Sequence, residues 1–332
     1  MAVLVTGGAG YIGSHAVASL KERGEEIVVV DNLEQGHREA VTGGKLYVGD
    51  LRDKDFLETV FKENSIDAVI HFAANSLVGE SMQNPGKYYH NNVYGTLCLL
   101  EKMIEHNVLK IVFSSTAATY GEPENVPIDE YDRTLPTNAY GETKLAMEKM
   151  MKWFDVAHGL KFVSLRYFNA AGAHESGVIG EDHNPESHLI PIVLQAALGQ
   201  RPHISVFGED YETEDGTCIR DYIHVSDLAD AHVLAVERLR TGADSSIYNL
   251  GNGQGFSVKQ VIDIARSVTE REIKAVIEPR RSGDPAVLVA ASDRARSELG
   301  WNPKRNKLED IIRSAWNWHV ANPQGYKGKA QE

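Results

Sequence analysis

The chain has 332 residues, which is long for one compact core and predicts two lobes or one large α/β domain with an elaborated end. An apolar content of 42% and a charged content of 24% exclude collagen-like, mucin-like and intrinsically disordered proteins. The formal net charge of −13 argues against nucleic acid or an anionic membrane as a partner, so an anionic ligand would need a local basic pocket.

The cysteines and the N-terminal segment indicate the compartment. Cys98 and Cys218 cannot form a disulfide scaffold and stand in no metal-ligand spacing, so we expect two ordinary thiols. Met1–Thr6 does not read as a signal peptide, and no apolar run approaches the roughly 20 residues that span a bilayer. These features predict a soluble, cytoplasmic protein.

Short apolar runs alternate with helical patterns through the first half of the chain. The runs are bounded by turn formers, and they are Ala2–Val5, Ile27–Val30, Leu46–Val48, Ala68–Phe72, Ile111–Ser114 and Phe162–Leu165. Between them, apolar residues recur with a period near 3.6 in Ile12–Leu20, Phe56–Phe61 and Val93–Ile104. Near-continuous apolar strands separated by helices predict an α/β fold with a doubly wound parallel sheet.

The pattern becomes irregular after Arg166. Residues 174–186 carry Gly, Pro, Asn and acids, which predicts a long functional loop. Later helices are predicted at Leu189–Leu198, Leu228–Leu239, Val258–Val268 and Leu308–Trp318, and later strands at Ile204–Phe207 and Ile247–Leu250. We expect a nucleotide-binding domain over residues 1–180, joined again by some later chain at about 220–250, and a smaller mixed α/β substrate-binding domain over 181–332.

A glycine-rich loop lies between the first strand and the first helix. Gly7, Gly10 and Gly13 allow a tight turn, close approach of the backbone to a phosphate, and close helix–strand packing. The helix start then offers N–H groups to a pyrophosphate. Asp31, after the second strand, can accept hydrogen bonds from two ribose hydroxyls and would repel a 2′-phosphate, which predicts NAD rather than NADP. The alternative is that Asp31 and Asn32 merely form a turn.

Two further strand ends carry candidate cofactor contacts. Asp50 and Leu51 follow the third strand, where they could meet the adenine edge. Phe72, Ala73 and Ala74 follow the fourth, and the alanines are small enough for a cofactor to lie against the backbone.

Tyr140 and Lys144 are one helical turn apart, so the phenol and the ammonium share a face. A free phenol has a pKa of about 10, and a lysine together with an oxidised nicotinamide would favour the phenolate. The alternative is an ordinary surface pair. The hydroxyl-rich strand end Ser114–Thr116 and the glycine loop favour a catalytic pair.

With these motifs the chain resembles the extended short-chain dehydrogenase/reductases, and within them the UDP-glucose 4-epimerase (UDP-galactose 4-epimerase) family. The resemblance covers nearly the whole chain. It rests on the glycine loop, the Tyr140/Lys144 pair, and the runs Val69–Ala73, Gly79–Ser81, Asn91–Val93, Leu165–Asn169, Thr213–Thr217, Arg220–Val225, Tyr248–Gly251 and Arg280–Asp284.

The resemblance implies that Tyr140 takes the proton of the sugar 4-hydroxyl while carbon 4 gives hydride to NAD, and that a transient 4-keto sugar turns over before the hydride returns. Thr116 would bond the reacting oxygen, and Lys144 would hold the nicotinamide ribose and lower the pKa of Tyr140. Further cofactor contacts are implied at Tyr11, Ile12, Asn91 and Phe168. UDP contacts are implied at Asn169, Leu189, Phe207, Arg220, Arg281 and Asp284.

The apolar stripes Val93–Ile104 and Leu145–Trp153 predict core or subunit contacts, and the family implies a homodimer in which two such helices of each subunit form a four-helix interface. Two arginines facing a diphosphate would supply the local basic pocket that the acidic surface requires. The alternative for Arg220 is a surface ion pair with Asp221 or Asp227.

The chain departs from the family at two positions. Ser76 stands where many relatives carry a lysine that reaches the NAD phosphates, which puts the tightness of NAD retention in doubt. Leu288 stands where relatives with narrow specificity have a tyrosine, so room for an N-acetyl group predicts that UDP-N-acetylglucosamine and UDP-N-acetylgalactosamine are also epimerised. The alternative is that Leu288 simply packs.

Competing functions find less support. A 4,6-dehydratase needs carboxylates directly after Thr116, where the chain has alanines. A UDP-glucuronate enzyme needs a further cation, and a non-catalytic NAD-binding protein would be expected to lose Tyr140 or Lys144. His183 and His188 have no obvious paired acid or thiolate, so we expect no metal site.

Overall fold

The computed structural model describes residues 1–281 and 284–326. Its centre is a seven-stranded sheet in the order β10-β6-β5-β4-β1-β2-β3, with every neighbouring pair parallel. The strands are β1 (Ala2–Thr6), β2 (Glu26–Asp31), β3 (Lys45–Val48), β4 (Ile66–His71), β5 (Lys110–Thr116), β6 (Lys161–Tyr167) and β10 (Ser246–Leu250). The predicted doubly wound parallel sheet is confirmed.

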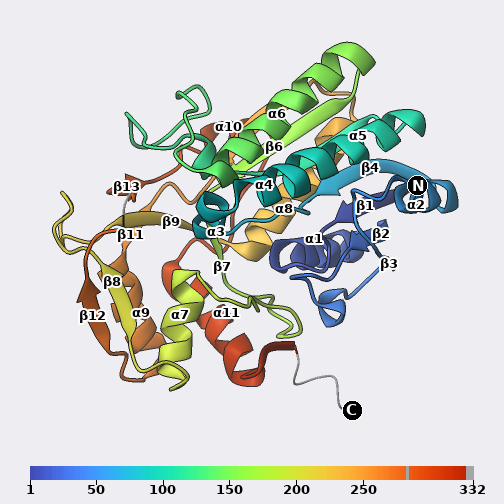
Figure 1. The fold of residues 1–332 in the computed structure, drawn as a ribbon. Coiled ribbons are helices and arrows are strands. Elements are labelled where there is room, and N and C mark those ends of the chain that lie inside the picture. Colours follow the sequence, from blue (N-terminus) through green and yellow to red (C-terminus); the bar gives the residue numbers. More distant parts are fainter. Residues whose placement is uncertain (282–283, 327–332) are drawn as a thin grey trace.

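Helices cover both faces of this sheet (Figure 1). Val3 and Val5 of β1 belong to one apolar core, together with residues of α1 (Tyr11–Glu22) and α8 (Val225–Arg240). Leu4 belongs to the other core, with residues of α2 (Lys54–Glu63), α5 (Gly95–Glu105) and α6 (Ala139–His158). Because side chains alternate along a strand, continuous apolar strands are what a sheet buried on both faces requires.

A smaller mixed region lies at the carboxyl edge of the sheet (Figure 1). One small sheet has the order β11-β9-β13, with β7 also paired to β9, and a second joins β12 to β8 in parallel. Its strands are β7 (Asn169–Ala171), β8 (Ile204–Phe207), β9 (Ile219–His224), β11 (Gly255–Ser257), β12 (Ala275–Glu278) and β13 (Val287–Leu288). A third apolar core joins β8 and β9 to the helices α7 (Leu189–Ala197), α9 (Val258–Thr269) and α11 (Leu308–Ala321).

The remaining helical segments are short: Arg38–Ala40, α3 (Val78–Gln83), α4 (Pro85–Tyr88), a wide turn over Tyr89–Tyr94, Ala117–Thr119 and α10 (Asp293–Glu298). Both cysteines are buried and free. Within residues 1–281 and 284–326, no helix has the length and apolar character needed to cross a membrane.

The chain crosses between the two regions more than once. β6 ends at Tyr167, and β7 begins two residues later in the smaller sheet. After β9, α8 packs back on the large sheet and β10 becomes its edge strand beside β6. The sequence did not predict β9 as a strand. The division of the chain at residue 180 stays a prediction.

Candidate active site

The glycine loop is closed too tightly to hold larger residues. Gly7 has a φ of 72°, and a Cβ there would lie 2.6 Å from the backbone nitrogen of Ala73. A Cβ at Gly13 would collide with the carbonyl oxygen of Gly7. The first turn of α1 carries no acidic residue, and its N-cap, Gly10, provides no side-chain cap. This cradle suits a dinucleotide pyrophosphate, because backbone can approach closely and the helix start is open to an anion.

Asp31 lies against this loop. Its Oδ2 accepts a hydrogen bond from the backbone nitrogen of Ala9 at 2.9 Å, and its Oδ1 accepts one from that of Leu33 at 2.9 Å. The side chain therefore forms the local turn that was the alternative and also reaches the glycine loop. Burial raises the pKa of Asp31, and the two N–H groups oppose that rise.

Asp50 lies beside Asn32 on the same side of the sheet. Two hydrogen bonds join its carboxylate to the Arg52 guanidinium, at 2.8 and 2.5 Å. Mainly through these bonds, Arg52 lowers the pKa of Asp50 to about 2, and Asn32 contributes a further hydrogen bond. Leu51 is almost fully buried beneath them. An adenosine contact here would therefore come from an oriented carboxylate.

The predicted catalytic pair is buried at the start of α6. Asn138 caps this helix by accepting from Gly141 N at 2.8 Å. Tyr140 and Lys144 are 8% and 3% exposed, so the alternative of a surface pair is wrong. The Lys144 ammonium lies 5.9 Å from the centre of the Tyr140 ring and donates to Ser114 O at 2.8 Å. Burial lowers the pKa of Lys144 to about 7.

The protein alone does not lower the pKa of the Tyr140 phenol. Burial raises that pKa strongly, Tyr167 and Tyr88 add to the rise, and a hydrogen bond with Thr116 opposes it. Thr116 ends β5 and also accepts from Ala118 N at 3.1 Å, which fixes its hydroxyl. The lowering of this pKa that we expected from Lys144 is not found, and removal of the phenol from water is the dominant cause of the shift. A phenolate therefore needs additional positive charge.

A buried ion pair that the sequence analysis missed lies beside the catalytic pair. Glu148, one turn after Lys144, accepts from Arg166 at 3.0 and 2.6 Å and from Ser115 Oγ at 2.6 Å. These contacts tie α6 to β5 and β6 directly behind Lys144. A second i, i+4 step after Tyr140 and Lys144 was the signal that could have found it.

The predicted UDP residues form a chain of contacts on the smaller region. The Arg281 guanidinium lies 4.8 Å from the centre of the Phe207 ring, and its Nε donates to Asp284 at 2.8 Å. Arg220 lies 3.7 Å from the other oxygen of Asp284 and donates to Pro285 O at 2.9 Å. The sequence therefore brings together an aromatic face, two guanidinium groups and a carboxylate, which can bind a base, a diphosphate and a ribose.

The alternative partners of Arg220 are wrong. The carboxylate of Asp221 accepts backbone N–H groups, including that of Asn252 at 2.8 Å. Asp227 pairs with Arg305 at 3.2 Å. The carboxylate that faces the Arg220 guanidinium is therefore that of Asp284.

The other predicted contacts lie in different surroundings. Asn169, on β7, donates to Asp221 O at 3.1 Å, and Leu189 is the first residue of α7. Asn91 donates to the neighbouring Asn92 at 3.0 Å. Ile12, Phe72 and Tyr11 line the glycine-loop side, where Tyr11 donates to Gly172 O at 2.7 Å.

Leu288 connects the two halves of the site. In the β13–β9 register it stands opposite Arg220, and its side chain packs against an apolar cluster that contains Ala117 and Phe168. Ala117 directly follows Thr116. Leu288 therefore lies between the predicted UDP contacts and the catalytic hydroxyl.

The argument from sequence against a metal is wrong in one respect. Glu181 and Glu186 lie beside His183 and His188, so the two histidines do have acidic partners.

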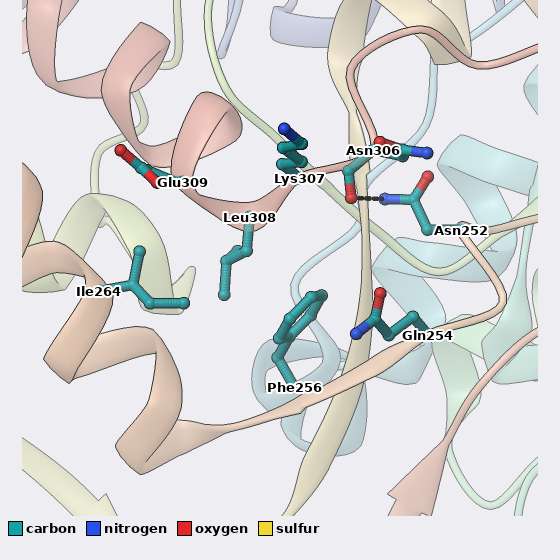
Figure 2. Close-up of a pocket in the computed structure, with 8 residues that line it drawn as sticks. All are labelled: Asn252, Gln254, Phe256, Ile264, Asn306, Lys307, Leu308 and Glu309. Atoms are coloured by element: carbon teal, nitrogen blue, oxygen red, sulfur yellow. Dashed lines mark hydrogen bonds between the residues drawn. The ribbon is translucent and has the colours of Figure 1, made fainter.

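A separate surface pocket of about 300 Å³ lies between α9 and the start of α11 (Figure 2). Its lining residues include Asn252, whose side chain donates to Asn306 O at 3.5 Å, and Phe256. None of the predicted catalytic, cofactor or UDP residues lines it. This pocket therefore does not mark the candidate active site.

Comparison with known proteins agrees with this geometry. Residues 3–251 match the model of the NAD dependent epimerase/dehydratase family. The chain belongs to that family. It is 63% identical over 326 residues to a UDP-glucose 4-epimerase of Halalkalibacterium halodurans, which covers 98% of each chain.

Two solved structures are similar over nearly their whole length. The UDP-glucose 4-epimerase of Bifidobacterium longum in complex with NAD⁺ and UDP is 42% identical, with a TM-score of 0.92 and coverage of 98% of this chain and 100% of that one. The UDP-Glc/GlcNAc 4-epimerase of Campylobacter jejuni is 41% identical, with a TM-score of 0.85 and coverage of 96% and 99%.

Proposed function

We propose that this protein is an NAD-dependent enzyme that interconverts UDP-galactose and UDP-glucose at sugar carbon 4 through a transient 4-keto sugar. The observation that carries the proposal is the buried phenol of Tyr140, held between Lys144 and Thr116 at the carboxyl edge of the sheet. The glycine cradle and the arginines on the smaller region lie on the two sides that a cofactor and a UDP-sugar need.

The residues of the chain divide the work in a simple way. Gly7, Gly13 and Asp31 would hold NAD, because their backbone and carboxylate fit its pyrophosphate and ribose. Bound NAD supplies two things that the chain lacks, a reversible hydride acceptor and a positive ring charge. Tyr140 takes the proton of the 4-hydroxyl and later returns it, while Thr116 bonds the reacting oxygen.

Substrate affinity comes from the UDP part of the substrate, which does not react. Arg220 and Arg281 give charge-assisted hydrogen bonds to the diphosphate, and Phe207 offers a face to uracil. The sugar must present both of its faces to the same phenol, so its own contacts have to stay weak in the ground state. This division explains why the two arginines belong to the smaller region, whereas Tyr140 lies on a helix of the large sheet.

Turnover of UDP-galactose by the purified protein tests the proposal. We expect formation of UDP-glucose, and we expect Tyr140→Phe to lower kcat by about 10²–10⁴-fold with UDP affinity retained, because a phenyl ring cannot carry the proton. Tyr222→Phe, a buried phenol in the core of the smaller region, is the control and should stay active. Full activity of the Tyr140 variant would overturn the proposal.

We also propose that the enzyme accepts the N-acetylated UDP-sugars. The support is the leucine at position 288, whose side chain is half-buried beside the catalytic strand end, and the two-substrate relative from Campylobacter jejuni. Leu288→Tyr would fill the space beside the catalytic strand end that an N-acetyl group needs. We expect it to abolish turnover of UDP-N-acetylglucosamine and to preserve that of UDP-galactose, whereas a wild type inactive on the N-acetyl substrate would contradict the proposal.

We propose a homodimer formed through the helices α5 and α6. Trp153 and Val156, late in α6, are 67% and 71% exposed, and such apolar side chains are enriched at interfaces. Light scattering should show a dimer that Trp153→Glu converts to a monomer. Val320→Glu, an equally apolar exposed residue on α11, is the control and should leave the dimer intact. A wild type that is monomeric at assay concentrations would contradict this proposal.

A further inference from the structure

Four side chains in the segment between β7 and α7 converge on one point. Glu181, His183, Glu186 and His188 each contribute one carboxylate oxygen or imidazole nitrogen, and these atoms all lie within 4.8 Å of one another. All four come from eight residues in the spacing Glu-x-His-x-x-Glu-x-His. None of them belongs to the predicted NAD or UDP contacts.

We propose that these four residues bind one divalent transition metal ion, for which zinc is the best match. Nδ1 of His188 lies 2.9 Å from Glu181 Oε1 and 3.1 Å from Glu186 Oε1. Nδ1 of His183 lies 3.2 Å from Glu181 Oε1 and 3.6 Å from Glu186 Oε2. Zinc bonds of about 2.0–2.1 Å in a tetrahedron place ligand atoms roughly 3.3 Å apart, inside the observed range.

The bonding of the buried atoms is incomplete without such an ion. The side chains of Glu181 and Glu186 are only 4% and 3% exposed. Glu181 Oε1 and His183 Nδ1 are buried, and although they approach each other, neither makes a hydrogen bond of good geometry within the described chain. Buried polar atoms normally have a hydrogen-bond partner. Polar atoms that surround one point without such partners therefore indicate an ion bound at that point.

One carboxylate is already oriented as a ligand would be. Glu186 Oε1 accepts from the backbone nitrogens of Ser187 and His188, each at 2.8 Å. Outer hydrogen bonds of this kind hold metal-binding carboxylates in place, and they leave Oε2 free to turn toward an ion. The preorganised carboxylate lowers the cost of ordering the site on binding.

The chemistry of the ligands selects the class of ion. Two imidazole nitrogens with two carboxylates suit zinc and its neighbours in the first transition row, whereas magnesium and calcium prefer sets made of oxygen. Two carboxylates also balance the charge of a divalent ion at this partly buried position, where Glu181 is buried and His188 is exposed.

The competing explanation is a metal-free ion-pair network. Burial alone would lower the pKa of His183, but the neighbouring carboxylates of Glu181 and Glu186 raise it to about 9. Glu181 likewise raises the pKa of His188, against burial, to about 10. Two protonated histidines would then balance two glutamates. The two explanations differ in metal content, which can be measured.

The position of the cluster gives the ion a positioning role. The Tyr11 ring meets the His183 ring edge to face, with centres 6.0 Å apart, and Tyr11 begins the helix after the glycine loop. His188 directly precedes Leu189, a predicted UDP contact at the start of α7. The segment passes between α1 and α11 (Figure 1). An ion here would fix the segment that connects the cofactor side to the substrate side.

Metal analysis of untagged, full-length protein tests the proposal. After treatment with a chelator, re-addition of Zn²⁺ and removal of unbound metal, we expect elemental mass spectrometry to find about one tightly bound zinc ion per chain. The double variant His183→Gln/His188→Gln should lose this ion. His174→Gln alters a histidine of the same segment that bonds Ser176 instead, and it should keep the ion.

Cobalt provides a readout that needs no variant. Co²⁺ added to the chelator-treated wild type should give the intense visible absorption of a tetrahedral site, and Zn²⁺ should abolish it. A wild type that retains neither ion, or a folded double variant that still binds one per chain, would overturn the proposal. Neither measurement uses turnover, so failure of the proposed function would leave this result standing.

Discussion

The two halves of the active site hold positive charge in opposite ways. Lys144 is buried, and within residues 1–281 and 284–326 no carboxylate forms an ion pair with it, so burial lowers its pKa to about 7. Arg281 is 57% exposed and already paired with Asp284. Here Tyr140 and Lys144 are called the buried pair, and Arg220, Arg281 and Asp284 the arginine arm.

The difference teaches how each half responds to a ligand. Removal from water makes the protonation of the buried pair sensitive to the next charge that arrives, because no solvent screens it. The arginine arm has water and a carboxylate as partners, so a diphosphate exchanges one charged partner for another. The buried pair should therefore govern the chemical step, and the arginine arm should govern affinity.

The largest expected effect on activity comes from removing the charge of Lys144 in the buried pair. Lys144→Met keeps the volume and removes the ammonium, and we expect kcat to fall by about 10²–10³-fold, since the phenol loses its nearest cation and proton transfer weakens. UDP affinity, measured by calorimetry, should hardly change. A variant whose defect lay in KM alone would show that the lysine only binds ligand.

The next effect concerns stability and pH. The pKa of Lys144 is about 7 in the folded protein against an ordinary value of 10.5, so between these values the unfolded chain binds more protons. The stability of the cofactor-free protein should therefore rise with pH across this window, and the penalty is fully present below pH 7. One pKa unit is worth about 1.4 kcal/mol, so the change reaches a few kcal/mol.

Lys144→Met provides the comparison for this linkage. It should melt at a higher temperature than the wild type at pH 6, and the gap should narrow by pH 9. A gap that is constant with pH would mean that Lys144 is not desolvated in the cofactor-free protein.

Much of the site was predictable because its motifs are local. Continuous apolar runs mark the strands, so the sequence also shows where each strand ends. This is why Thr116, Asp31 and the glycine loop could be placed at the carboxyl edge of the sheet. The short strand β9 was missed, since four of the six side chains of Ile219–His224 are charged or titratable, which does not resemble an apolar strand. Glu148, on the helix α6, was missed because its partner Arg166 lies on a different element, the strand β6.

The pKa of Tyr140 shows a different limit. The sequence names the lysine that should lower it, but it cannot give the depth of burial, and burial decides the direction in the protein alone. The glutamates beside His183 and His188 were overlooked for a related reason. An irregular segment has no period from which contacts can be read, so only the folded backbone brings the four side chains together.

A smaller effect is expected in the arginine arm. Arg281→Ala should raise KM for UDP-galactose by about tenfold, the lower end for a charged hydrogen bond, because the guanidinium is exposed. The value of kcat should stay near that of the wild type. Arg280→Ala is the matched control, since this neighbour pairs with Asp210 and lies over Tyr211 instead. Equal defects in both variants would contradict a specific role for Arg281.

The smallest expected effect is that of salt, and it separates the two halves without any mutation. Between about 0.01 and 0.15 M ionic strength the Debye length falls from roughly 30 to 8 Å, so attraction between the exposed Arg281 and a diphosphate is screened. KM should rise a few-fold, whereas kcat should stay constant, because the buried pair is not reached by ions. The rise should be smaller in Arg281→Ala, which lacks the screened charge. A kcat that fell with salt while KM held would reverse the assignment of chemistry and affinity to the two halves.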